Sequence, residues 1–501
     1  MADLYPFVKA TPESVGIASA WIQDFLDIID EKRVNLHGFM IVRNGKCAAE
    51  GYWAPFNEDY IHRMYSCSKS FTSTAIGILI GDGRIGLNDP IIDYFPEYRP
   101  ADPHPYQLSM TIRDLLMMAT PYAEGSYEFS DPDWTWTFFN KNKPTHPGGT
   151  IWHYDTSGTH TMSALVEKLT GMKLMDFLYE RVFRYMGGSD DMWCISAPEG
   201  YSWGGSGVLA RQRDLARLGY LWLNNGRFNG MQLVPEWYIK EASSKQIDNE
   251  LLGLHGRRDR IGYGYQVWME PDGGFSFWGL ATQYMLAYRE KGLMLVTTGD
   301  TLSRGSDESI VQEAFSECIL KRLSDEALPE DEAAQKALEA RLAGLEVYLP
   351  VGETDSAWRE KIDGKTYALC ENRMGMKTVR FDFAPDGSDG VISWENEQGK
   401  KCVRFGMGRY IEGRFPQWGY AYDVIAKPTD YLYRTLNAGC WVEPHKLELS
   451  MFIEDVQCGL ITWKIAFINE GNTVAMMLCK TGENILWEYW GNCSGERLVD
   501  N

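Results

Sequence analysis

The sequence lacks the features that mark membrane, secreted and nucleic-acid-binding proteins. No apolar run reaches the roughly 18–20 residues that cross a bilayer, and residues 1–6 carry neither the basic nor the apolar part of a secretory signal. The 501 residues include 49 Lys and Arg against 69 Asp and Glu, a formal net charge of −20 that repels phosphate backbones and anionic lipids. We therefore expect a cytoplasmic protein with no nucleic-acid or membrane partner.

The sequence also lacks the spacings of metal sites and redox pairs. Its 10 cysteines include no C-x-x-C pair and its 8 histidines no H-E-x-x-H run, the patterns by which zinc sites and thioredoxin-type pairs are recognised. In a long chain without a secretory signal, we expect such cysteines to be reduced and mostly buried. We expect neither a metal ion nor an organic cofactor.

Composition and length instead indicate an ordinary globular protein of two or three domains, with 44% hydrophobic and 24% charged residues. Apolar periodicity predicts helices at 18–31 and 66–80, and strand-like runs on both sides of Asn44-Gly45 predict a hairpin over 37–53. Helical patterns dominate 89–241, and strand patterns return at 262–268, 284–289 and 292–298. This order predicts an α/β (α+β) fold: one antiparallel sheet built from both ends of the domain, flanked by helices, with a helical insert.

The C-terminal part changes to short strands. Residues 324–345 are rich in Ala, Glu, Lys and Leu, which indicates a polar connecting helix. Between 365 and 490, roughly eight to ten runs alternate polar and apolar residues, which predicts a closed, lipocalin-like all-β barrel or a sandwich. We therefore predict three segments: a mixed domain, a helical linker and a β domain, over 1–323, 324–350 and 351–501.

One short motif can carry chemistry: Ser66-Cys67-Ser68-Lys69, an S-x-x-K at the start of the helix predicted at 66–80. Residues i and i+3 share a helix face, so the lysine amine can reach the serine hydroxyl. A serine needs a base to attack a carbonyl, and a desolvated lysine of lowered pKa can supply one. Taken alone, the four residues favour a plain helix start with a solvated lysine, because about one S-x-x-K arises by chance in such a chain.

The surroundings of the motif change this interpretation. They resemble the serine β-lactamase and penicillin-binding-protein superfamily, and within it the class C-like branch of esterases and amidases that includes 6-aminohexanoate-dimer hydrolases and family VIII esterases. The segments that carry the resemblance follow in the family's order at 64–71, 81–90, 111–116, 152–158, 204–211, 214–217, 225–227 and 233–235. The resemblance implies a β-lactamase/transpeptidase-like fold and a serine hydrolase that forms an acyl-enzyme. No G-x-S-x-G run supports an α/β-hydrolase instead.

The resemblance also assigns roles to residues. Ser66 corresponds to the acylated nucleophile and Lys69 to its base. Tyr154 corresponds to the tyrosine of the family's Y-x-N motif, which relays protons to and from the leaving group; its alternative is a packed aromatic residue at a loop-to-helix junction. Thr156 stands where the family has Asn and is expected to contact substrate, although a hydroxyl lacks the separate carbonyl and amino groups of an amide.

The family's third motif, Lys-Thr-Gly on a strand beside the nucleophile, is altered. A literal Lys480-Thr481-Gly482 lies far outside the first domain, and we expect it to form a hairpin turn. The equivalent segment is Phe277-Trp278-Gly279-Leu280, whose first three residues are then expected to contact substrate, with Phe277 in the lysine position. The backbone N–H groups of Leu280 and Ser66 would form the oxyanion hole.

Without that lysine, the site offers no positive charge to a substrate carboxylate. We therefore rank cleavage of an ester or amide above β-lactam hydrolysis or D-amino-acid peptidase activity, and a non-enzymatic binding or scaffold protein of the same fold is a further alternative. The aromatic loop 121–149, with Tyr122 and Trp134, either lines a pocket for an apolar or aromatic acyl group or packs onto the helical insert. The β domain is by default a stabilising module, and it could instead bind a small ligand, cover the active site or form a homodimer.

Overall fold

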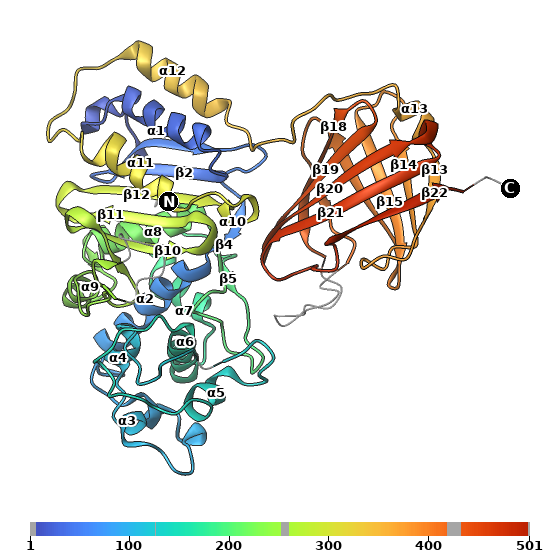
Figure 1. Cartoon of the computed structure of the whole chain (residues 1–501). Coiled ribbons are helices and arrows are strands. Elements are labelled where there is room, and N and C mark those ends of the chain that lie inside the picture. The colour runs from blue at the N-terminus through green and yellow to red at the C-terminus, as the bar shows by residue number, and fades with distance from the viewer. Residues whose placement is uncertain (1–6, 126, 252–259, 418–431, 499–501) are drawn as a thin grey trace. The chain divides into compact units, whose positions relative to one another are not determined.

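The computed structural model describes residues 7–125, 127–251, 260–417 and 432–498 (Figure 1). Residues 1–6, in which the sequence shows no secretory signal, lie outside these ranges. None of the described helices combines the length and the apolar character needed to cross a bilayer.

Two compact units make up the chain. The first consists of residues 1–299 and 307–346, and the second of residues 300–306 and 347–501. Neither unit is one continuous stretch, because the chain enters the second unit briefly at 300–306 and then returns to the first. All 10 cysteines are free and six of them are buried.

A seven-stranded sheet forms the centre of the first unit, in the order β1-β3-β2-β12-β11-β10-β9. Every neighbouring pair is antiparallel except β1–β3. The N-terminal hairpin thus pairs with strands that follow it by more than 200 residues, which confirms the predicted sheet built from both ends of the domain. The strands are β1 (Val8–Lys9), β2 (Leu36–Arg43), β3 (Lys46–Tyr52), β9 (Trp268–Met269), β10 (Phe275–Gly279), β11 (Gln283–Tyr288) and β12 (Leu293–Gly299).

Helices cover both faces of this sheet (Figure 1). On one face lie α1 (Ser19–Glu31) and α11 (Ser309–Phe315), and on the other α8 (Gln212–Leu223) packs against β2, β11 and β12. The apolar residues of α1 recur at helical spacing, so a single stripe faces the core. The buried members of this stripe are Ile22, Phe25, Leu26 and Ile29.

The segment expected as a helical linker, 324–350, contains α12 (Glu332–Ala343). Asp331 caps this helix by accepting a hydrogen bond from the Ala334 N–H over 3.0 Å. Leu338 is its buried residue, and the helix packs on α1 and β3. The helix belongs to the first unit.

A helical insert lies between the two halves of the sheet, as predicted. Its first helix, α2, is buried along almost its whole length because other helices and the sheet surround it. The remaining elements are short and joined by long loops. The bounds are α2 (Ser68–Gly81), α3 (Pro105–Leu108), α4 (Ile112–Leu116), α5 (Trp134–Asn140), α6 (Thr156–Thr170), α7 (Leu174–Arg181), α9 (Glu236–Ala242), β4 (Ile61–Arg63), β5 (Trp193–Cys194), β6 (Val208–Arg211), β7 (Arg227–Phe228) and β8 (Met231–Gln232).

One strand prediction in this unit is wrong. The run 262–268 is not one strand: Tyr263 makes isolated bridges, and the regular strand β9 begins only at Trp268. Gln266 takes the left-handed conformation, with φ 63°, and its backbone N–H donates to the Leu116 carbonyl rather than to a strand neighbour. Apolar alternation alone did not reveal this tertiary hydrogen bond, which breaks the strand.

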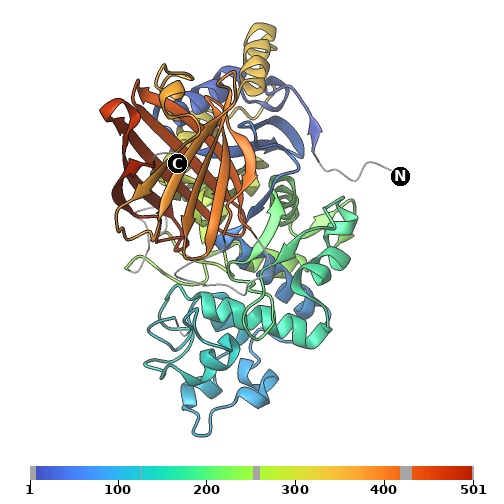
Figure 2. The ribbon, with the colours of Figure 1, turned by 90° about the vertical axis from the view of Figure 1, so that its right-hand side faces the viewer.

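The second unit is a β-barrel (Figure 2). Its sheet runs β16-β15-β14-β13-β22-β21-β20-β19-β18-β17, and a parallel pairing of β16 with β18 closes nine strands into a ring. The prediction of a barrel is confirmed. The unit contains α10 (Thr301–Arg304), α13 (Arg359–Ile362), β13 (Lys365–Leu369), β14 (Thr378–Phe383), β15 (Asp389–Asn396), β16 (Gly399–Met407), β17 (Ile411–Arg414), β18 (Arg434–Glu443), β19 (Lys446–Glu454), β20 (Cys458–Ile468), β21 (Thr473–Gly482) and β22 (Gly491–Arg497).

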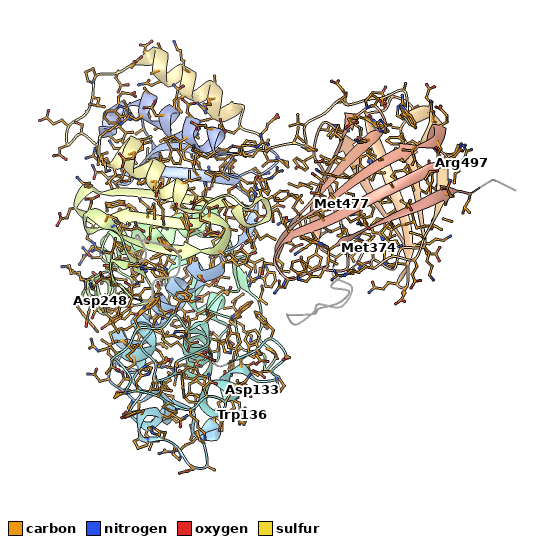
Figure 3. The ribbon with its side chains drawn as sticks, viewed as in Figure 1. Asp133, Trp136, Asp248, Met374, Met477 and Arg497 are labelled. Carbon is orange, nitrogen blue, oxygen red and sulfur yellow. The ribbon has the colours of Figure 1, made fainter. Side chains whose placement is uncertain are left out.

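The literal Lys480-Thr481-Gly482 is not a hairpin turn. It ends strand β21 and pairs with β20, so that Gly482 lies opposite Gly459. Met477 on the same strand is 49% exposed (Figure 3), whereas Lys480, three positions later and on the opposite face, is fully buried. The Lys480 amine lies 4.9 Å from the centre of the Trp487 ring and has no hydrogen-bond partner among the described residues.

Candidate active site

Ser66 and Lys69 lie where a 3-10 turn, Tyr65–Cys67, leads into α2. Helical geometry places the two side chains on one face, and Lys69 Nζ donates a hydrogen bond to Ser66 Oγ over 3.1 Å. Nζ also donates to the Gly205 carbonyl over 2.6 Å. The Lys69 side chain is buried, so it is not a solvated lysine at a plain helix start.

The environment of Lys69 favours its neutral form. Burial lowers the pKa of Lys69 to about 7, because the ammonium loses its hydration. The negative charge of Asp155 opposes this shift, and the positive charge of Arg63 adds to it. Near pH 7 a large fraction of the lysine is therefore neutral and able to accept a proton.

Tyr154 also lies beside Ser66 and Lys69, although it comes from a different segment of the chain. It precedes α6, whose N-terminus Asp155 caps by accepting the Ser157 N–H over 2.8 Å. The Tyr154 ring lies 4.8 Å from Lys69 Nζ. Burial raises the pKa of Tyr154, and its contact with the Ser66 hydroxyl acts in the opposite direction. The phenol therefore stays protonated at neutral pH and can donate a proton beside Ser66.

Strand β10 brings the altered third motif to the serine. A Cβ on Gly279 would lie well within 3.0 Å of the Met64 carbonyl oxygen, so this close approach of two backbones requires glycine. Trp278 and Leu280 line the space beside Ser66. Phe277 points to the other face of the strand, into the core, where it packs edge-on against Trp222 at 5.2 Å.

Backbone conformations on both sides of this site are unusual. Tyr65, immediately before Ser66, has φ 44°, and Ala281 and Thr282 have φ 65° and 71°. Residues other than glycine rarely adopt this left-handed region, and such strain persists only where the surroundings enforce it. The two strained segments flank the serine and the Leu280 N–H, the groups that the sequence predicts for attack and for the oxyanion.

A pocket of about 250 Å³ opens beside the serine. Aromatic rings dominate its wall, and two of them, Trp268 and Trp278, stack with their centres 5.0 Å apart. The described residues that line it are Tyr65, Ser66, Tyr154, Ser206, Trp268, Trp278, Gly279, Leu280, Tyr284 and Glu308. The nucleophile candidate, its proton donor and the third-motif strand thus meet in one concave site.

Besides Phe277, three predicted substrate contacts lie outside this pocket. Tyr122 is fully buried and its hydroxyl accepts a hydrogen bond from Gln107 over 3.2 Å. Trp134 stacks on Tyr127 at 4.3 Å. The methyl group of Thr156 packs beside Gly205. In the loop 121–149, these contacts fit the alternative in which its aromatic residues pack onto the helical insert.

Tyr65 and Ser206 lie in segments that carry the family resemblance but had no predicted role, and three further pocket residues were missed by sequence reasoning: Trp268, Tyr284 and Glu308. Tyr284 donates its O–H to Glu308 Oε2 over 3.1 Å, and Glu308 Oε1 accepts the Ala281 N–H over 3.0 Å. None of them belongs to a motif with a recognisable spacing. Only the folding of β9, β11 and the start of α11 against the helical insert brings them to Ser66.

The amino-acid sequence of this chain is similar to a known protein family and to individual proteins. A sequence model of the family described as Beta-lactamase matches residues 27–309. The 6-aminohexanoate-dimer hydrolase of Paenarthrobacter ureafaciens is 26% identical over 224 residues, which are 41% of this chain and 56% of the relative. A protein described as Beta-lactamase from Yersinia enterocolitica is 25% identical over 160 residues, 30% of this chain and 39% of the relative. This chain thus matches less than two thirds of the length of these relatives.

Solved structures share the fold. A Bacillus anthracis protein, assigned by its description to the 6-aminohexanoate-dimer hydrolases, aligns with a TM-score of 0.52 at 21% identity, over 65% of this chain and 89% of its own. The structure of SurE aligns with a TM-score of 0.50 at 13% identity, over 93% of this chain and 98% of its own. Both identities are too low to transfer more than the fold.

Proposed function

This chain belongs to the beta-lactamase family, whose sequence model matches more than half of its residues, and from that premise we propose that it is a serine hydrolase that cleaves an ester or amide bond. The observation that carries the proposal is the hydrogen bond of 3.1 Å from Lys69 Nζ to Ser66 Oγ, buried beneath an aromatic pocket. The name of the Paenarthrobacter relative, a hydrolase, supports the same reaction class.

The first step is acyl transfer to Ser66. Neutral Lys69 takes the hydroxyl proton as Oγ forms a bond to the substrate carbonyl carbon. The negative charge that develops on the carbonyl oxygen is stabilised by the backbone N–H groups of Ser66 and Leu280, which border the same pocket. Collapse of this intermediate breaks the bond to the leaving group, which takes a proton from Tyr154, and Lys69 returns its proton to the phenolate.

The second step releases the acyl group. A water molecule gives its proton to the neutral Lys69 while its oxygen attacks the acyl carbon. The Ser66 oxygen leaves and regains a proton, and the free carboxylic acid departs. These steps use only side chains and backbone of this chain, and the expected substrate is a small ester or amide whose acyl group enters the aromatic pocket.

The decisive experiment is active-site labelling of the whole chain with a neutral fluorophosphonate, read by intact mass. We expect one adduct on the wild type, no adduct on Ser66→Ala, and an unchanged adduct on the control Ser206→Ala, which alters the other serine of the pocket. Cleavage of p-nitrophenyl esters should follow the same pattern. A wild type that takes no label and cleaves no ester would instead support the non-enzymatic alternative.

A further inference from the structure

The pocket beside Ser66 carries a negative charge. Glu308 is the one residue with a charged side chain among the described residues that line it, and it takes part in none of the salt bridges among the described residues. The carboxylate is half-buried, so water screens it less than it would a surface charge. A carboxylate in such a place, with no ion-pair partner among the described residues, attracts a cation.

Glu308 is held in place but keeps room for another donor. Its two oxygens accept hydrogen bonds from the Ala281 N–H and the Tyr284 O–H. Burial raises the pKa of Tyr284, and the Glu308 charge acts in the same direction, so the tyrosine remains the donor. A carboxylate offers about four acceptor positions, and two of these remain after both bonds are made.

Aromatic faces continue from this carboxylate to Ser66. Tyr154 stacks on Trp268 at 5.4 Å, Trp268 on Trp278 at 5.0 Å, and Trp278 lies 6.1 Å from Tyr284. The Trp278 Nε1–H donates to buried Glu270 over 3.2 Å, which fixes the indole ring. The negative faces of such rings attract ammonium groups.

We propose that this pocket selects esters or amides that carry an ammonium group near the scissile bond, with the cation bound by Glu308 and the aromatic faces. The inference rests on the proposed hydrolase function and names its substrate class. It reverses the charge preference of the family's Lys-Thr-Gly lysine, because Phe277 in the lysine position faces the core and Glu308 supplies the opposite charge.

The test compares two p-nitrophenyl esters of nearly equal shape, 4-(trimethylammonio)butanoate and its neutral isostere 5,5-dimethylhexanoate. For the wild type, we expect kcat/KM to favour the cationic ester by about tenfold or more. In Glu308→Gln, which keeps an acceptor for the Ala281 N–H, this ratio should fall towards one, because the cationic ester loses more kcat/KM than the neutral ester does. The control Glu313→Gln, an exposed residue of α11, changes the net charge equally and should leave the ratio unchanged.

Each other outcome overturns the inference. A wild type that treats both esters alike has no cationic subsite. If Glu308→Gln slows both esters equally, the carboxylate only supports the turn at Ala281. Fluorophosphonate labelling separates the two proposals: a labelled wild type without cation preference contradicts only this inference, whereas a wild type that is neither labelled nor active removes the hydrolase function and this inference with it.

Discussion

Gly279 and Met64 are in backbone contact across the site: the third-motif strand meets the turn before the serine with no space for a Cβ between them. This contact fixes the distance between the Leu280 N–H and Ser66, which the proposed oxyanion hole requires. An oxyanion hole works only when both donors are held in place before reaction begins.

Gly279→Ala should therefore lower kcat/KM for ester cleavage by about 10²-fold or more, the effect of losing one oxyanion donor. The matched control is Gly344→Ala, where the nearest atoms would lie at 3.5 and 3.7 Å, which is ordinary contact. Steady-state kinetics on both variants, with circular dichroism to verify folding, measure the effect. Equal kinetics in the two variants would mean that β10 moves freely without cost to the reaction.

The pH profile should report Lys69. The pKa of Lys69 is lowered to about 7, and only the neutral amine accepts the serine proton. We therefore expect kcat/KM for a neutral ester to be low in acid and to rise with pH through about 7. Asp155 raises the pKa of Lys69, and Asn can also cap a helix. Asp155→Asn should thus shift the acid limb to lower pH, and a shift to higher pH would contradict the assignment of Lys69 as the base.

Tyr154→Phe should separate leaving groups by their need for a proton. p-Nitrophenolate leaves without one, whereas an anilide nitrogen must be protonated, so we expect the variant to lose about 10²–10⁴-fold in kcat on anilides and clearly less on p-nitrophenyl esters. Parallel rates on an ester and an anilide of the same acyl group measure the difference. Equal losses on both substrates would indicate that the ring only packs beside Lys69.

The buried Lys480 should weaken the barrel at neutral pH. Burial lowers the pKa of Lys480 to about 8, so between pH 8 and its ordinary value the unfolded chain binds a proton that the folded chain does not. Stability therefore rises with pH across this window, by an amount on the order of 3 kcal/mol. Lys480→Met should raise the melting temperature at pH 7 and raise it less at pH 9.5.

Scanning calorimetry of the full chain at the two pH values tests this prediction. The control is Lys464→Met, which removes the same charge from an exposed position on β20 and should change the melting temperature little at either pH. A Lys480→Met variant that melts lower at pH 7 would show that the amine is stabilised by a partner.

The sequence predicted those parts of the fold and site that depend on residues close together in the chain. Ser66 and Lys69 meet because i and i+3 share a helix face. The hairpin over 37–53 forms because Asn44 and Gly45 both adopt the left-handed conformation that its two-residue turn requires. The barrel strands likewise show in the sequence as alternating runs, since one face of each is buried. These elements need no information from distant parts of the chain.

Features that depend on contacts between distant segments of the chain were not predicted correctly from the sequence. Strand alternation sends Phe277 into the core, although the motif placed it at the lysine position. Gln266 turns out of strand geometry to reach the Leu116 carbonyl, 150 residues earlier. Glu308 follows no motif, and it enters the pocket only because the turn at Ala281 and the Tyr284 hydroxyl hold it there.

The return of the chain to the first unit after 300–306 has a consequence for genetics. The barrel is not built only from the C-terminal part of the chain. Helix α10 packs on β20 and β21, and Thr481 donates a hydrogen bond to the Ser303 carbonyl. However, α10 precedes α11 and α12 in the sequence. A deletion from residue 347 onward would leave α10 without its barrel. Because residues 300–306 of the barrel unit precede α11 in the chain, recombination at a single joint could neither add nor remove this barrel intact.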